Sequence, residues 1–209
     1  MLCRKSTRRI GLTLVETLAV IVIVASLSAL LFPVMAGARK SGWQVVCGSN
    51  LQQIGRATGL YLADYDDHFP TSVNAFERED PSIRLGRGKE DDPNNFPTPL
   101  EVLSPYTREP RLFVCPLDLG ASIGGKFRAY PRLHPRNGGS SYLFAELFQG
   151  QTQSTWSNPS RAIWACDGSP SWHSRSFNGY DFSTFAIMAV HYDFNVKLVR
   201  NQNAPTFLE

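Results

Sequence analysis

The side chains that could carry chemistry in this sequence include four cysteines, Cys3, Cys47, Cys115 and Cys166. None of them belongs to a C-x-x-C pair, which is the spacing typical of metal knuckles and of thioredoxin-type redox sites. In an oxidising compartment, one disulfide among the three downstream cysteines is the expected chemistry. The residues by themselves leave the pairing among these three open.

Nucleophilic catalysis is a second candidate chemistry. The candidate nucleophiles are Cys115 and Ser140. The candidate bases are His173 and His191, and Asp167 would orient the base. No nucleophile elbow or similar local signature surrounds these residues, and a lone histidine among strands is more often a turn or core residue. We therefore predict that the protein is not an enzyme.

Three acidic residues, Asp64, Asp66 and Asp67, offer the oxygen ligands that calcium prefers. The glycine and the distal glutamate of an EF-hand loop are missing from this segment. We interpret the three residues as the solvated end of a helix, and we expect no metal and no other cofactor.

Glu16 is the most unusual ionisable residue. It is the single ionisable side chain between Leu12 and Met35, a run long enough to cross a bilayer as a helix. A carboxylate inside such a helix costs up to about a few kcal/mol and needs a positive partner. Cleavage after Gly11 would create one, because the new α-amino group on Leu12 would lie one helical turn from Glu16, on the same chain or on a neighbour.

The residues before the apolar run are basic. Residues 1–11 contain Arg4, Lys5, Arg8 and Arg9 and no acidic residue. Positive flanking charge predicts that this end lies in the cytoplasm and the bulk of the chain outside, and the run is too long for an ordinary cleaved signal peptide. Removing these four from the 21 basic residues leaves 17 against 18 acidic ones. The near-neutral remainder makes nucleic acid an unlikely partner.

The elements that would position these residues follow from periodicity. Residues 38–65 are predicted to form an amphipathic helix, with apolar or small side chains at helical spacing: Val45, Val46, Leu51, Ile54, Thr58, Tyr61, Leu62 and Tyr65. Gly55 and Gly59 would let another segment approach this helix closely.

Beyond this helix, residues 68–111 read as a long loop with a short helix around Leu100 to Ser104. The runs expected to form strands are Leu112–Cys115, Tyr142–Phe148, Ala162–Cys166, Phe185–Val190 and Asn195–Val199. One long helix followed by several short strands predicts an α+β fold, in which a small antiparallel sheet packs against the helix.

Aromatic residues in the last third of the chain suggest a binding module as an alternative. They are Trp156, Trp164, Trp172, Phe177, Tyr180, Phe182 and Phe185, with Arg161 and Arg175 nearby. Such side chains can stack on sugars or on single-stranded nucleic acid. Core and loop packing in a small sheet domain explains them equally, and we favour that interpretation.

The segment Gly11-Leu-Thr-Leu-Val-Glu16 resembles the type III signal of type IV prepilins. The resemblance implies that a prepilin peptidase cuts between Gly11 and Leu12 and methylates the new N-terminus. It also implies that Glu16 pairs with the N-terminal amine of a neighbouring subunit in a filament core. Leu12 replaces the phenylalanine that is usual in the family.

Two further segments resemble the prepilin-like group whose C-terminal module is named for an H-x9-D-G motif. These are the helix segment that begins at Cys47 and the Phe113-Val-Cys115-Pro element. The resemblance implies a Cys47–Cys115 disulfide, with Cys166 free or buried. The C-terminal motif is degenerate: Asp167-Gly168 matches, whereas His191 is followed after nine residues by Asn201 in place of the aspartate.

The resemblance implies a pilin-like organisation: a leader at 1–11, a transmembrane helix at 12–36, its amphipathic continuation at 37–67 and a periplasmic or extracellular head at 68–209. The expected function is a prepilin or pseudopilin subunit of a type II secretion pseudopilus or type IV pilus-like filament. Expected partners are the prepilin peptidase, other pilin subunits, an inner-membrane assembly platform and membrane lipid. The alternative is a signal-anchored periplasmic binding protein for sugar or nucleic acid that does not assemble.

Overall fold

The computed structural model describes residues 13–74, 77–78, 92–118, 121–123, 126–128, 139–145, 150–155, 158, 160–168, 173 and 186–200. The chain divides into two compact units, Met1–Ser41 and Gly42–Glu209, and each is described by itself. The predicted leader, Gly11, Leu12 and Asn201 lie outside the described residues.

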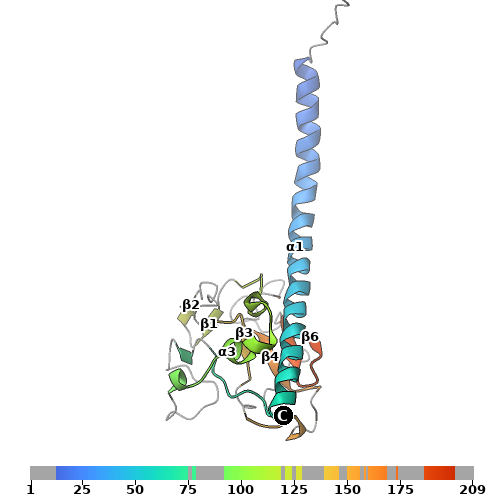
Figure 1. The fold of residues 1–209 in the computed structure, drawn as a ribbon. Helices are drawn as coiled ribbons and strands as arrows, with labels where there is room; N and C mark the ends of the chain where they lie inside the picture. The colour runs from blue at the N-terminus through green and yellow to red at the C-terminus, as the bar shows by residue number, and fades with distance from the viewer. Residues whose placement is uncertain are drawn as a thin grey trace, which may run out of the picture. The chain divides into compact units, whose positions relative to one another are not determined.

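One long helix, α1, runs from Leu14 to Asp64, so that its residues belong in part to each unit (Figure 1). A capping box closes its N-terminus. The Thr13 N–H donates to Glu16 Oε2 at 2.8 Å, and the Glu16 N–H donates to the Thr13 hydroxyl oxygen at 3.3 Å. These two bonds satisfy backbone donors that the first turn of a helix leaves without intrahelical partners.

The part of α1 that follows Gly42 buries one face. Leu51, Ile54, Thr58 and Leu62 are buried at intervals of three and four residues, which confirms the predicted amphipathic helix. Val45 and Val46 depart from the expected pattern and are largely exposed, because the buried face begins at Cys47. Tyr65 is exposed as well, since it lies just after the helix end, where Asp66 and Asp67 adopt positive φ angles.

The second unit contains a four-stranded antiparallel sheet in the order β3-β4-β5-β6. Its strands are β3 (Tyr142–Phe144), β4 (Ile163–Asp167), β5 (Ala186–His191) and β6 (Val196–Arg200). Each corresponds to a run predicted to form a strand. Two further short strands, β1 (Ala121–Ile123) and β2 (Lys126–Arg128), pair with each other.

The strand predicted for Leu112–Cys115 is wrong. Pro110–Phe113 forms a short 3-10 helix, η3, with Pro110 at its first turn. The Glu109 carboxylate accepts from the Arg111 N–H at 3.2 Å and caps the turn. Proline at the start and a carboxylate cap favour a helical turn over the extended conformation that the apolar residues suggested.

The core lies between α1 and the sheet. Cys47, Leu51, Ile54 and Leu62 from α1 join one cluster whose other members include Phe69, Tyr142, Phe144, Trp164, Val190 and Tyr192. The Trp164 indole N–H donates to the Thr58 hydroxyl at 3.1 Å, which satisfies a polar group in the middle of this cluster. A second, smaller cluster contains Ile163, Cys166, Ile187, Ala189 and Val199.

Short helices border this core. They are η1 (Pro93–Asn95), α3 (Pro99–Leu103), η2 (Ser104–Tyr106) and η6 (Gln153–Thr155), and α3 confirms the short helix expected around Leu100.

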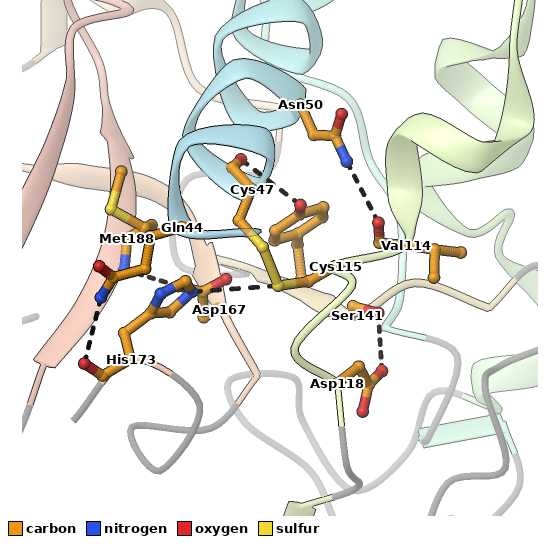
Figure 2. The surroundings of a disulfide bond; sticks show 11 residues. Gln44, Cys47, Asn50, Val114, Cys115, Asp118, Ser141, Asp167, His173 and Met188 are labelled. Atoms are coloured by element: carbon orange, nitrogen blue, oxygen red, sulfur yellow. Dashed lines mark hydrogen bonds and ion pairs between the residues drawn. A yellow bond between two sulfur atoms is a disulfide. The ribbon is translucent and has the colours of Figure 1, made fainter. Parts of the chain in front are cut away.

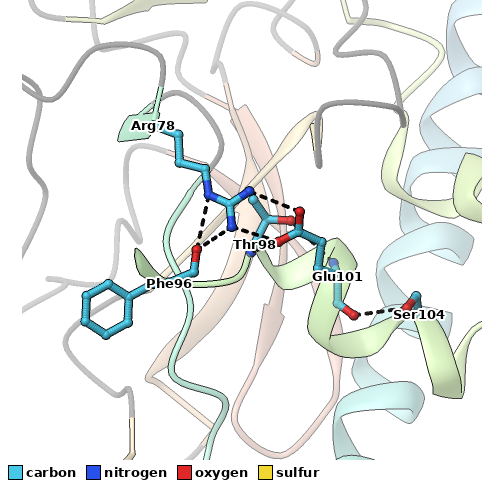
Figure 3. A network of polar contacts seen from close by, with 5 residues as sticks. All are labelled: Arg78, Phe96, Thr98, Glu101 and Ser104. Atoms are coloured by element: carbon cyan, nitrogen blue, oxygen red, sulfur yellow. Dashed lines mark hydrogen bonds and ion pairs between the residues drawn. The ribbon is translucent and has the colours of Figure 1, made fainter. Parts of the chain in front are cut away.

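Thr98 and Glu101 form a capping box at the start of α3. The Arg78 guanidinium pairs with the Glu101 carboxylate at 2.8 Å and donates to the Phe96 carbonyl, so that it joins two loop segments to the helix (Figure 3). The fold is therefore α+β, with a long apolar N-terminal helix and a small antiparallel sheet.

Candidate functional site

The first candidate site is the apolar surface of α1 in the first unit. Its large hydrophobic side chains between residues 14 and 35 are exposed, and Leu14 reaches 81% exposure. They are Leu14, Val15, Leu18, Val20, Ile21, Val22, Ile23, Val24, Leu27, Leu30, Leu31, Phe32, Val34 and Met35. The helix is long and apolar enough to cross a membrane. A surface this apolar is typical of a segment covered by lipid or by other helices.

Glu16, the predicted assembly residue, makes its local contacts through one oxygen. Glu16 Oε2 accepts from both the backbone N–H and the hydroxyl of Thr13, each at 2.8 Å. Thr13 was missed in the sequence, although T-x-x-E before an apolar run is the pattern of a capping box. Glu16 therefore has a structural role at the helix start that is independent of any assembly.

The second candidate site surrounds a disulfide. Cys47 of α1 and Cys115, which follows η3, are joined with a Cα–Cα distance of 5.2 Å, and this is the pair that the family resemblance implies. Both residues are buried. Figure 2 shows the bond between their sulfur atoms. Cys166 is free and buried. Burial, with the nearby Asp167 charge as a smaller cause, raises the pKa of the Cys166 thiol to about 12, so that this cysteine stays protonated and unreactive.

A buried histidine–aspartate pair lies against this disulfide. His173 Nε2 is 2.9 Å from Asp167 Oδ2 and 3.9 Å from the Cys115 sulfur. Asp167 Oδ2 also accepts from the Met188 N–H of β5 at 2.6 Å. The His173 carbonyl accepts from the Gln44 side chain of α1 at 3.2 Å. Burial raises the pKa of Asp167, and the bond to His173 opposes that rise.

The geometry does not form a nucleophilic triad from the predicted residues. Cys115, His173 and Asp167 do come together, yet the same histidine nitrogen faces both the sulfur and the carboxylate. A triad uses one ring nitrogen for each partner, and its nucleophile must be free, whereas the Cys115 sulfur is in a disulfide. The other candidate nucleophile, Ser140, donates to the Phe113 carbonyl at 3.4 Å and accepts from the Tyr142 N–H at 3.0 Å.

The remains of the C-terminal motif are spread along the sheet. Asp167 ends β4, and the Gly168 N–H donates to the Ser141 carbonyl at 2.9 Å. His191 ends β5 and pairs with Ile163 at the opposite end of β4. Burial lowers the pKa of His191, which favours its neutral form. The structure thus does not bring His191 to Asp167, and Asn201 lies outside the described residues.

Asp64 and Asp66, two of the three acidic residues considered for calcium, line a pocket of about 730 Å³. Asp64 Oδ2 accepts from the Tyr106 hydroxyl at 2.7 Å, and this bond raises the pKa of Tyr106 to about 12. Asp66 and Asp67 form the left-handed turn after α1. Tyr61 stacks on Tyr65 with ring centroids 4.2 Å apart, and its ring also meets the Tyr106 ring edge-on.

The aromatic residues suggested as a binding platform divide into two groups. Trp164 belongs to the core and is bonded to Thr58, which is the packing role that we favoured for it. Trp156, Trp172, Phe177, Tyr180, Phe182, Phe185 and Arg175 lie outside the described residues.

Comparisons with known proteins add no relative. No family model, no curated protein and no solved structure matches the chain.

Proposed function

We propose that this chain is a prepilin or pseudopilin subunit, cleaved after Gly11 and assembled through its N-terminal helix into a filament of the type II secretion or type IV pilus kind. The observation that carries the proposal is the exposed apolar face of α1 between residues 14 and 35, interrupted by the single acid Glu16. Lipid would cover this face before assembly, and neighbouring helices would cover it in the filament.

The charge of Glu16 supports an intermolecular partner in addition to its capping role. Both bonds with Thr13 use Oε2, so Oε1 remains for a second donor. The α-amino group released on Leu12 is a donor of the required sign. In an apolar surrounding, an acid and an amine attract each other strongly, because little water screens them.

The experiment that tests the proposal is N-terminal sequencing and intact mass of the full chain recovered from membranes of cells that contain a prepilin peptidase. We expect a mature chain that begins at methylated Leu12. The matched control is Gly11→Ala, which removes the glycine at the cut and should leave residues 1–11 attached. A wild-type chain that still begins at Met1 beside a peptidase that processes its own substrates would overturn the proposal.

The second candidate, a signal-anchored binding protein, is favoured by one observation. The pocket beside Asp64 has the volume of a small-ligand site and is lined by Tyr61, Tyr65 and Tyr106, whose rings suit a sugar. Such a protein would share the membrane helix but keep its leader. The same N-terminal sequencing therefore separates the two candidates.

A further inference from the structure

The cluster around the disulfide holds a complete set of metal-binding atoms. Cys47, Cys115, Asp167 and His173 are all buried, and one ligating atom from each lies within 4.8 Å of those from the other three. Two sulfurs, one imidazole nitrogen and one carboxylate oxygen are donors with which proteins hold zinc in tetrahedral, closed sites. The cysteines come from distant parts of the chain, so no C-x-x-C spacing reveals the set in the sequence.

Two polar atoms of this cluster lack partners among the described residues. They are Asp167 Oδ1 and His173 Nδ1, on side chains that are fully buried. The pairing of the two side chains offsets part of the cost of burying a carboxylate and an imidazole, but it leaves one polar atom of each without a partner. The unpartnered carboxylate oxygen of Asp167 is the second observation that points to a ligand, and His173 faces the cluster through Nε2.

The four residues are also held in place by different elements (Figure 2). Cys47 lies on α1, and Cys115 follows η3. Asp167 is the last residue of β4, and the Met188 N–H of β5 fixes its carboxylate. His173 is tied through its carbonyl to Gln44. Asp167 and His173 are thus each anchored by at least one contact that does not involve the sulfur atoms.

We propose that the reduced chain binds one zinc ion at Cys47, Cys115, Asp167 and His173, and that the disulfide and the metal are alternative occupants of one buried position. Two molecules of a thiol reductant open the disulfide. They become a disulfide themselves, and each cysteine gains a proton. Zinc then replaces the two thiol protons, which go to solvent, while Asp167 and neutral His173 supply the remaining ligands. The inference uses only the second unit and does not depend on the proposed filament function.

The test uses the full chain in detergent micelles, and the disulfide is reduced with a phosphine under anaerobic conditions. The phosphine becomes the phosphine oxide, whose oxygen atom comes from water. Cobalt(II) serves as the spectroscopic probe and zinc as the competitor. We expect one cobalt per chain, a thiolate-to-cobalt charge-transfer band and the intense visible bands of tetrahedral cobalt, all removed by one equivalent of zinc. The oxidised chain should bind neither metal. Absence of stoichiometric binding by the reduced wild-type chain would overturn the proposal.

Variants separate this site from binding by the thiols alone. His173→Ala and Asp167→Asn each remove a ligand. Loss of a partner that only supports a ligand costs about 10–100-fold in metal affinity, and these two variants should lose more zinc affinity than that. The matched controls are His68→Gln, an exposed histidine, and Cys166→Ala, the free buried cysteine, and both should bind zinc like the wild type. Equal affinity in the His173 and Asp167 variants would contradict the proposal.

A measurement of folding covers the case in which the reduced chain unfolds. The near-ultraviolet circular dichroism of the buried Trp164 reports the packed core. If reduction abolishes this signal, zinc should restore it in the wild-type chain and not in the His173→Ala chain, because a metal that binds only the folded state drives folding. Failure of zinc to restore the signal would count against the site.

Discussion

At the scale of single residues, Glu16 combines two roles that are usually considered apart. Its carboxylate completes a capping box with Thr13, and its charge is the feature on which the proposed assembly depends. The first role needs only an acceptor at the third helical position, which an amide provides as well as a carboxylate. The second role needs a negative charge. The two roles can therefore be separated by substitution.

We predict that Glu16→Gln abolishes filament assembly while the capping of α1 is kept. Thr13→Ala should do the reverse: it weakens the helix start by about 0.5–2 kcal/mol and leaves assembly in place. The measurement is the amount of filament sheared from cells, with membrane-bound subunit as the reference. Filaments of normal abundance in Glu16→Gln would show that Glu16 acts only as a cap.

At the scale of elements, the side chains that pack against α1 determine which glycines of the helix tolerate a larger residue. A Cβ on Gly55 would lie 3.0 Å from Val190 Cγ2 of β5, and one on Gly59 would lie 3.4 Å from the Phe194 ring. The sequence predicted that these glycines allow another segment to approach, and side chains of the sheet region make that approach. Gly42, by contrast, faces open space on the same helix.

We predict opposite effects for alanine at two of these glycines. Gly42→Ala should stabilise the chain by about 0.5–1 kcal/mol, because alanine favours the helix over glycine and meets no neighbour. Gly55→Ala has the same propensity gain but forces Val190 to move, so it should be less stable than Gly42→Ala by about 1 kcal/mol or more. Denaturant unfolding of the two variants measures the difference. Equal stabilisation in both would mean that the sheet does not pack on α1 at Gly55.

The start of α3 offers a pH-dependent test of local structure. The hydrogen bond from Arg78, opposed by burial, lowers the pKa of Glu101. A lowered carboxyl pKa gives stability that is present above the pKa of the unfolded chain, about 4.3, and is lost as pH falls through the folded-state value. Glu101→Gln keeps an acceptor for the capping box and removes the charge.

We therefore predict that Glu101→Gln lowers the free energy of unfolding at neutral pH by less than about 1 kcal/mol, because the ion pair is partly exposed. The deficit should disappear in acid, where the wild-type carboxylate is protonated. Unfolding curves collected across the acid range provide the measurement. A deficit that does not change with pH would assign the effect to the cap and not to the charge.

At the scale of the whole molecule, the disulfide closes a long loop across the second unit. Cys47 and Cys115 are 68 residues apart in sequence. We predict that the Cys47→Ser/Cys115→Ser double variant loses about 4 kcal/mol of stability, because the unfolded chain regains the freedom of that loop. The measurement is denaturant unfolding of oxidised chains in the presence of a chelator, with Cys166→Ala as the control. A loss below about 1 kcal/mol would mean that the loop is already restricted in the unfolded chain.

The sequence predicted the parts of the molecule that depend on local pattern. Spacing of three and four residues located the buried face at Leu51, Ile54 and Leu62, and short β-prone runs located β3 to β6. It was wrong at Leu112–Cys115, where Pro110 and Glu109 outweigh the apolar residues. The sequence offered Cys115, His173 and Asp167 as candidate catalytic residues, but it could not show that they meet at a disulfide, because these segments come together only in the folded chain.

The covalent bridge between α1 and Cys115 also has a mechanical consequence. Tension applied to the helix N-terminus and resisted at the other end of the chain passes from Cys47 directly to Cys115 through the sulfur atoms. The bond bypasses the 68 residues of sequence separation, so that they stay between fixed ends even where their packing against the sheet gives way. At about 3.5 Å for each extended residue, roughly 240 Å of contour length cannot be drawn out. A pull on α1 therefore reaches Cys115 along a covalent path that does not depend on the packing of α3 or η3.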